Sequence, residues 1–176
     1  DEAGVNEVTL FRHFGSKAAL LSEALQCAAR HSLVTGLPAE PRDPGAELTE
    51  WCRTHLEHLH RARSMIRTCM GEMAQAPEIA GCASATPARV SDELHRYLLR
   101  LRERGLAGTD FDPRAAASML MGALFTDAMG RDMMPEKYGY SAEEAPAMYV
   151  RLFLRAIGAE PARGAPAEEA ESAGHA

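Results

Sequence analysis

The sequence has no CxxC pair, no long apolar run and no extended alternation of apolar and polar residues. Four cysteines, Cys27, Cys52, Cys69 and Cys82, are scattered over the 176 residues, which predicts reduced thiols and not a disulfide framework. No apolar run approaches the roughly 20 residues of a membrane span, so we expect no membrane partner. With no signal-peptide pattern at the start, we expect a cytoplasmic protein.

Motifs of catalysis are missing as well. The chain has no glycine-rich phosphate loop, no nucleophile elbow and no metalloprotease histidine pair, so we expect neither an enzyme nor a cofactor. Cys52, His55 and His58 are spaced i, i+3 and i+6. Because position i+6 of a helix points largely away from position i, we expect no metal site there.

The formal net charge of −6 argues against a protein that coats nucleic acid. One short segment differs, because Arg12 and Lys17 are the only formal charges between Val8 and Ser22, with His13 beside them. Acidic residues collect at positions 40–57 and after Glu143. A local positive potential at this segment is compatible with DNA binding.

Helical periodicity and capping residues divide the chain into an all-α fold. Ser16 precedes a helix that we expect to end near Gly36, and the linker over 37–44 holds three prolines. Asp43 with Pro44 then caps a helix whose apolar face includes Trp51, His55 and Leu56. This pattern predicts a helix-turn-helix part over residues 1–36 and a ligand-binding and dimerisation domain over residues 44–158.

The second half continues in helices. Residues 81–86 lack periodicity and are predicted to be a loop, after which Pro87 begins a helix that stops at Gly105. Asp112 and Pro113 open a helix over 113–129 that is apolar nearly all round, and a capping box over 141–144 introduces a helix to Ile157. We expect these last two helices to form a homodimer interface, and residues 159–176 to be disordered.

The segment from Ala3 to Leu21 carries the functional signal. Gly4 suits a tight turn between helices, and a single short helix follows. Leu10 and Phe14 supply its packing side together with Val8 or Thr9, whereas Arg12 and His13 project outward. A helix this short does not persist alone, so we interpret it as a reading head that neighbouring helices hold in a major groove.

This segment resembles the helix-turn-helix of the TetR/AcrR family, whose pattern runs Ala-Gly-Val, Thr-Leu-Tyr, His-Phe, Ser-Lys and a leucine pair. The resemblance covers about Ala3 to Leu25. It implies that phosphates are met by Thr9, His13 and Lys17, and that bases or groove walls are met by Asn6, Glu7, Val8 and Phe11. Arg12 adds positive charge on the same helix.

Two departures from the family pattern affect these roles. Phe11 stands where the family usually has tyrosine, so apolar contact replaces a phenol bond to phosphate. The family's first helix and most of its second are expected to be absent, with residues 1–3 as a remnant. DNA binding by this chain is therefore an open question at the level of the sequence.

Residues of the larger domain suggest a ligand site. His55 shares an apolar face with Trp51, and the nine methionines of the chain include Met70 and Met73. With Tyr97 these side chains predict a pocket for a small apolar or aromatic effector. The competing interpretation is that His55 is a satisfied core residue and that the methionines fill the core.

These patterns and the resemblance together predict a ligand-responsive transcriptional regulator that binds double-stranded operator DNA. The resemblance implies a repressor that is released from DNA when its effector binds. The alternative is a helical small-molecule-binding or scaffold domain without DNA activity. The identity of the effector and the operator sequence are not encoded in any pattern found here.

Overall fold

The computed structural model describes residues 6–30, 36–73 and 78–159, and within these ranges all regular elements are helices. The prediction of an all-α fold is confirmed. In chain order the elements are α1 (Glu7–Phe14), α2 (Lys17–Arg30), α3 (Pro44–Glu72), α4 (Glu78–Glu103), α5 (Pro113–Gly130), the 3-10 helix η1 (Pro135–Lys137) and α6 (Ala145–Ala156).

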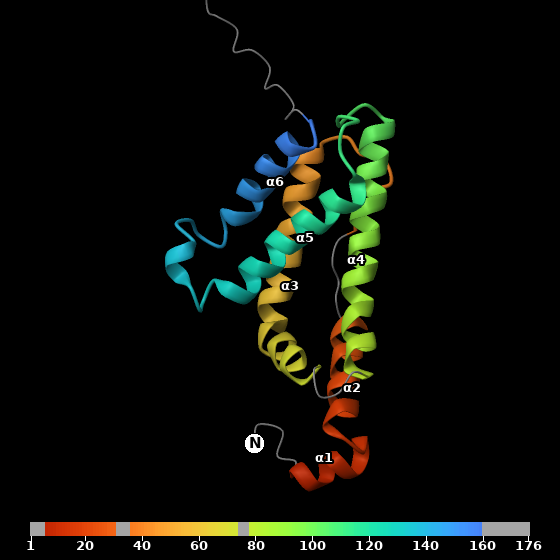
Figure 1. Ribbon diagram of the computed structural model, residues 1–176, viewed down its shortest axis with the longest axis vertical. Coiled ribbons are helices and arrows are strands. Elements are labelled where there is room, and N and C mark those ends of the chain that lie inside the picture. The colour runs from red at the N-terminus through yellow and green to blue at the C-terminus, as the bar shows by residue number, and fades with distance from the viewer. Residues whose placement is uncertain (1–5, 31–35, 74–77, 160–176) are drawn as a thin grey trace, which may run out of the picture.

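The helices form one elongated body with α1 at one end (Figure 1). Helix α3 runs from the linker toward that end, and α4 runs back in the opposite direction. Helix α5 crosses and packs against both α3 and α4, while α6 packs against α3 and α2 packs against α4. Helix α1 is thus connected to the larger domain through α2.

The helix starts agree with the caps expected from the sequence. Asp43 Oδ1 accepts the Ala46 amide at 3.0 Å, and Glu47 returns the contact by accepting the amides of Arg42 and Asp43. Asp112 Oδ1 accepts the Ala115 amide at 2.7 Å. These bonds satisfy amides that a helix start otherwise leaves without partners.

The capping box before α6 is also present, one turn ahead of the helix. Glu144 Oε2 accepts the Ser141 amide at 2.9 Å, and Ser141 Oγ accepts the Glu144 amide at 3.2 Å. Regular α-helix begins only at Ala145, with a proline in its first turn. The box therefore fixes the entry of the chain into α6.

The stops after α4 and α6 are glycines in the left-handed conformation. Gly105 has φ +70° after α4, and Gly158 has φ +65° after α6. After Gly158 the amide of Ala159 donates to the carbonyl of Leu154 at 2.8 Å, and Ala159 is buried. The expectation that the disordered tail begins at Ala159 is wrong for that residue, because this turn folds it onto the core. Residues 160–176 lie outside the described residues.

The predicted loop over residues 81–86 is wrong, because these residues belong to α4. Pro87, expected to begin a helix, lies inside it. Two of the six residues are alanine, and the segment is continuous with the rest of α4, so it is helical without an apolar stripe of its own. The missing amide of Pro87 costs one helical bond, which the packing of the long helix outweighs.

The linker before α3 is held by α4. Glu93 Oε1 accepts the amide of Leu37 at 2.7 Å, and an Arg100 guanidinium nitrogen donates to the carbonyl of Pro38 at 3.1 Å. Pro41 is buried. The proline-rich segment is therefore packed against the larger domain along the described residues 36–43.

A single apolar core lies between α3, α4, α5 and α6. Its largest fully buried side chains include Trp51, Tyr97, Leu94, Leu120 and Val150. Burying each leucine-sized side chain contributes roughly 1.5–3 kcal/mol. The polar residues buried with this core are His55 and Asp127.

Candidate nucleic-acid interface and regulatory domain

Helix α1 presents one exposed face and one packing face. Thr9, Arg12 and His13 are exposed, and Val8 is 72% exposed. Leu10 and Phe14 are half-buried on the opposite side. The prediction that Val8 or Thr9 belongs to the packing side is wrong, because both residues lie on the exposed face.

Asn6 has a structural role at the start of α1. Its Oδ1 accepts the amide of Val8 at 3.1 Å, and its carbonyl accepts the amides of Thr9 and Leu10. This capping stabilises the short helix. The side chains of Glu7 and Phe11, both predicted to meet bases, lie outside the described residues.

A two-residue turn sets the angle between α1 and α2. Gly15 has φ +79°, and Ser16 Oγ accepts the amide of Ala19 at 3.1 Å. Only glycine adopts such a φ without strain, so the Gly-Ser pair ends one helix and caps the next. Lys17, three residues after the end of α1, opens α2 with an exposed side chain.

Lys17 is paired with an acid of the larger domain. Its Nζ donates to Glu72 Oε1 at 2.6 Å, and Glu72 is the last residue of α3. Sequence reasoning assigned Lys17 to a phosphate and did not foresee this partner, because the two residues are 55 positions apart. The pair joins the start of α2 to the end of α3.

Trp51 and His55 form a stacked pair in the core. Their ring centroids lie 4.1 Å apart, and both side chains are buried. Burial, together with the nearby charges of His58 and Arg89, lowers the pKa of His55 to about 4, so its ring is neutral near pH 7. Among the described residues, Trp51 Nε1 and His55 Nδ1 have no hydrogen-bond partner.

The structure does not place Tyr97, Met70 and Met73, the other predicted effector residues, in one pocket with Trp51 and His55. Tyr97 is buried, and its hydroxyl donates to Glu47 Oε2 at 2.5 Å, which ties α4 to the start of α3. Met70 is 52% exposed, and Met73 is the C-cap of α3. Because α3 is unbroken, Met70 lies roughly 28 Å along the helix from Trp51. The five residues therefore do not line a common cavity.

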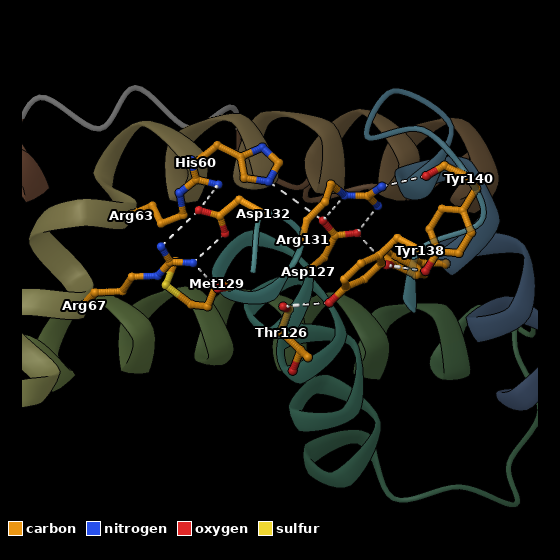
Figure 2. A network of polar contacts seen from close by, with 11 residues as sticks. His60, Arg63, Arg67, Thr126, Asp127, Met129, Arg131, Asp132, Tyr138 and Tyr140 are labelled. Carbon is orange, nitrogen blue, oxygen red and sulfur yellow. Dashed lines mark hydrogen bonds and ion pairs between the residues drawn. The ribbon is translucent and has the colours of Figure 1, made fainter. Parts of the chain in front are cut away.

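A polar network inside the larger domain was missed by sequence reasoning (Figure 2). Asp127 is 1% exposed on α5, and its oxygens accept from Arg131 at 2.8 and 2.5 Å. The Tyr149 hydroxyl donates to Asp127 Oδ2 at 2.6 Å and contacts the Tyr140 hydroxyl at 2.8 Å. The available signal was one acid in an apolar helix with an arginine four residues later, which is the spacing of a helical ion pair.

Burial alone would raise the pKa of Asp127. The hydrogen bonds from Arg131 and Tyr149 and the charge of Arg131 outweigh it, so the pKa lies below the usual range. Asp127 is thus held as a carboxylate. The hydroxyl of Tyr149 is held protonated, because burial and its bond to Asp127 raise its pKa.

The end of α5 is also connected to α3 by charged groups. His60 Nε2 lies 3.8 Å from Asp127 Oδ1, and an Arg67 guanidinium nitrogen lies 2.6 Å from Asp132 Oδ1. Arg67 also donates to the carbonyl of Met129, and Arg63 lies 3.5 Å from Asp132. These contacts fix the crossing of α5 over α3 (Figure 2).

Neither a metal cluster nor a membrane span occurs in the described ranges. No group of three or more metal-ligating side chains lies there that could hold a metal ion. None of the helices described has the length and apolarity needed to cross a membrane.

A short exposed helix, joined by a connecting helix to a larger helical domain, is the arrangement of helical DNA-binding regulators. Comparison of the sequence with family models agrees with this class. Residues 46–159 match the family model of the AefR-like transcriptional repressor, C-terminal domain. Residues 1–24 match the model of bacterial regulatory proteins of the tetR family. The chain therefore belongs to the TetR family of transcriptional regulators.

Solved structures show the same arrangement. The chain is similar to the TetR family transcriptional regulator PfmR from Thermus thermophilus, with 25% identity and a TM-score of 0.68 over 87% of this chain and 83% of that one. A putative TetR-family transcriptional regulator from Rhodococcus sp. shares the fold at 16% identity and a TM-score of 0.64, over 89% of this chain and 82% of that one. No curated protein matches the sequence.

The network around Asp127 leads to a prediction on stability. Asp127→Asn is expected to lower the free energy of unfolding at pH 7 by about 2–3 kcal/mol, because Arg131 loses its buried carboxylate partner. The pKa of Asp127 is lower in the folded protein than in the unfolded chain, where it is about 4. The carboxylate therefore stabilises the folded protein above about pH 4, and this stabilisation is lost as the pH falls through the lowered pKa. Urea unfolding of wild type and variant between pH 7 and acidic pH measures both effects.

Asp110→Asn is the matched control, since Asp110 is exposed and the formal charge change is the same. We expect the control to unfold like wild type at pH 7. Equal stability of Asp127→Asn and wild type at pH 7 would show that the network does not stabilise the domain.

Proposed function

We propose that the protein is a ligand-responsive repressor that acts in the cytoplasm as a homodimer and releases operator DNA when an effector binds. The observation that carries this proposal is the exposed face of α1, with Thr9, Arg12 and His13 on it and the exposed Lys17 three residues after the helix. The matched family models favour a regulator over an enzyme, and one of them is described as a repressor.

The ion pair between Lys17 and Glu72 suggests that DNA and the larger domain compete for Lys17. A lysine that contacts a DNA phosphate releases counterions and contributes to affinity for every sequence. In the structure the same ammonium is held by Glu72 at the end of α3. Phosphate and Glu72 therefore compete for Lys17, and the position of α3 influences the outcome.

Helix α4 offers a second connection. Trp51 and His55 lie on α3, and Arg89 of α4 is close enough to influence His55. Helix α4 also packs against α2. An effector that separates α3 from α4 near Trp51 would move α2 and the reading helix with it, which changes the affinity for DNA.

The DNA-binding function is tested by replacing Lys17 and Glu72. Lys17→Ala is expected to weaken binding to all duplex DNA and to lower the slope of log affinity against log salt by about 1, because one phosphate contact is lost. Glu72→Gln is expected to strengthen binding, because Lys17 is released from its acidic partner. Fluorescence anisotropy with an operator selected from random duplexes, at several salt concentrations, measures both changes.

Arg61→Ala serves as the control for a lost cation, because Arg61 is exposed on α3 and pairs with Glu57. If the wild-type protein binds no duplex DNA in the selection, the alternative of a helical binding or scaffold domain without DNA activity takes precedence. If Glu72→Gln binds as wild type does while Lys17→Ala binds more weakly, the proposed competition is wrong.

A homodimer is supported by the outer faces of α5 and α6. Helix α5 buries one side against the core and leaves apolar and small residues exposed on the other, including Met119, Gly122 and Phe125. Leu152 of the neighbouring α6 is 61% exposed. Exposed apolar surface on two adjacent helices favours pairing with a second copy through a four-helix interface.

Phe125→Glu and Leu152→Glu are each expected to shift the protein from dimer to monomer, because a charge would have to be buried at the interface. Sedimentation equilibrium at micromolar concentration measures the shift. Met70→Glu is the control and should remain dimeric, because Met70 lies on α3 and its exposure of 52% falls between those of Phe125 and Leu152. A monomeric wild-type protein would contradict the proposed assembly.

The effector is proposed to be a small apolar or aromatic molecule that binds beside Trp51 and His55. Trp51 is the only tryptophan of the chain, so its fluorescence reports binding at this place. We expect uncharged apolar compounds that stabilise the protein in a thermal-shift panel to change that fluorescence, and His55→Phe to abolish the change while Met70→Ala preserves it. Stabilisation by metal ions or strongly anionic compounds alone would contradict this assignment.

A further inference from the structure

A cavity lies away from Trp51, where the chain between α5 and α6 folds back on both helices. Its volume is about 280 Å³. Three of the four tyrosines of the chain line it, together with one lysine and parts of α5. The lining residues are Gly122, Ala123, Thr126, Asp127, Lys137, Tyr138, Tyr140 and Tyr149.

The tyrosine rings are held in place by bonds to the protein. The Tyr138 hydroxyl donates to the carbonyl of Thr126 at 2.9 Å, and the hydroxyls of Tyr140 and Tyr149 lie 2.8 Å apart. The Arg131 guanidinium lies 4.5 Å from the centroid of the Tyr138 ring and 5.2 Å from that of Tyr140 (Figure 2). Because the protein already holds these side chains in place, they lose little conformational entropy when a ligand binds.

The α5 side of the cavity is built from small residues. Gly122 and Ala123 belong to the lining, and a Cβ atom added at Gly122 would meet no atom within 4 Å. The tyrosine rings pack edge to face on one another, with centroids 6.1 Å apart for Tyr138–Tyr140 and 5.9 Å apart for Tyr140–Tyr149, so the space lies between these rings as a group and the small residues of α5. The volume of about 280 Å³ lies just below the range of about 300–1,000 Å³ typical of ligand pockets, which favours a single ring.

The charges at the cavity favour an anion. Asp127 is neutralised, because its oxygens accept from Arg131 and Tyr149. Lys137 is exposed, and no acidic side chain of the described residues lies within ion-pair distance of its ammonium. Its Nζ lies 5.5 Å from the centroid of the Tyr138 ring. One cation is therefore available beside the aromatic walls.

We propose that this cavity binds a single-ring aromatic carboxylate, with the ring against Tyr138, Tyr140 and Tyr149 and the carboxylate on Lys137. The ring gains edge-to-face contacts with the tyrosines, and the carboxylate gains a charge-assisted hydrogen bond. Gly122 belongs both to the lining and to the exposed side of α5 that we propose for dimerisation, so the site borders that interface. Binding at this site does not require DNA.

Isothermal titration of the whole protein with benzoate tests the proposal. We expect saturable binding with one site per chain, and weaker binding of benzamide, which lacks the charge, and of cyclohexanecarboxylate, which lacks the aromatic ring. The fluorescence of Trp51 is expected to stay unchanged, which separates this site from that of the effector. This titration is read without DNA, so its failure and the failure of the DNA-binding function are distinguishable.

Variants locate the site. Lys137→Met is expected to weaken benzoate binding by about tenfold or more, since a charge-assisted bond is lost, and Lys137→Arg to restore most of the affinity. Tyr138→Leu, which keeps bulk without an aromatic ring, should also weaken binding. Arg114→Met removes a cation from an exposed position of α5 elsewhere and should bind as wild type.

Three results would overturn the proposal. These are no saturable binding of benzoate to the wild-type protein, equal binding of benzoate and cyclohexanecarboxylate, and equal affinities of Lys137→Met and wild type. A dimer that binds benzoate only after Phe125→Glu has separated it would show instead that the partner copy fills the cavity.

Discussion

The continuity of α3 is the constraint on which the other contacts depend. Its 29 residues make a rod of roughly 43 Å, and different stretches of this rod meet different parts of the molecule. The first turn is fixed by Asp43 and Glu47, the middle stacks Trp51 on His55, and the last residue, Glu72, holds Lys17 of α2. Because α3 is one uninterrupted helix, these contacts are linked through it, and α3 relates the core of the larger domain to the end of the molecule that carries α1.

Local signals in the sequence predicted local structure well. The caps at Asp43 and Asp112 and the stop at Gly105 depend only on neighbours in the chain, and the structure shows their bonds and their backbone conformation. The segment 81–86 was misread because hydrophobic periodicity indicates a helix only where one face is buried. The side chains described in this segment are exposed or half-buried, and it is helical as part of the continuous helix α4.

The candidate sites were harder to predict, because they depend on distances that sequence spacing does not give. Trp51 and His55 were found together because they share one turn of helix, whereas Met70 was grouped with them although the same helix carries it far away. The pairs Lys17–Glu72 and Asp127–Tyr149 join residues 55 and 22 positions apart. No pattern in a single sequence predicts such pairs, since each requires the packing of whole helices to be known.

The composition of α5 becomes intelligible once its surroundings are known. A helix that is apolar nearly all round suits either complete burial or two separate apolar contacts. One side of α5 packs on α3 and α4, and the opposite side is exposed although it is small and apolar. Asp127 is the exception on the buried side, and it is tolerated because Arg131 and Tyr149 supply its charge partner and hydrogen bonds. Arg131 lies just after α5 and Tyr149 lies on α6, so the bonds of Asp127 fix the segment that connects the two helices. The carboxylate that costs desolvation energy therefore also positions the tyrosines that line the cavity.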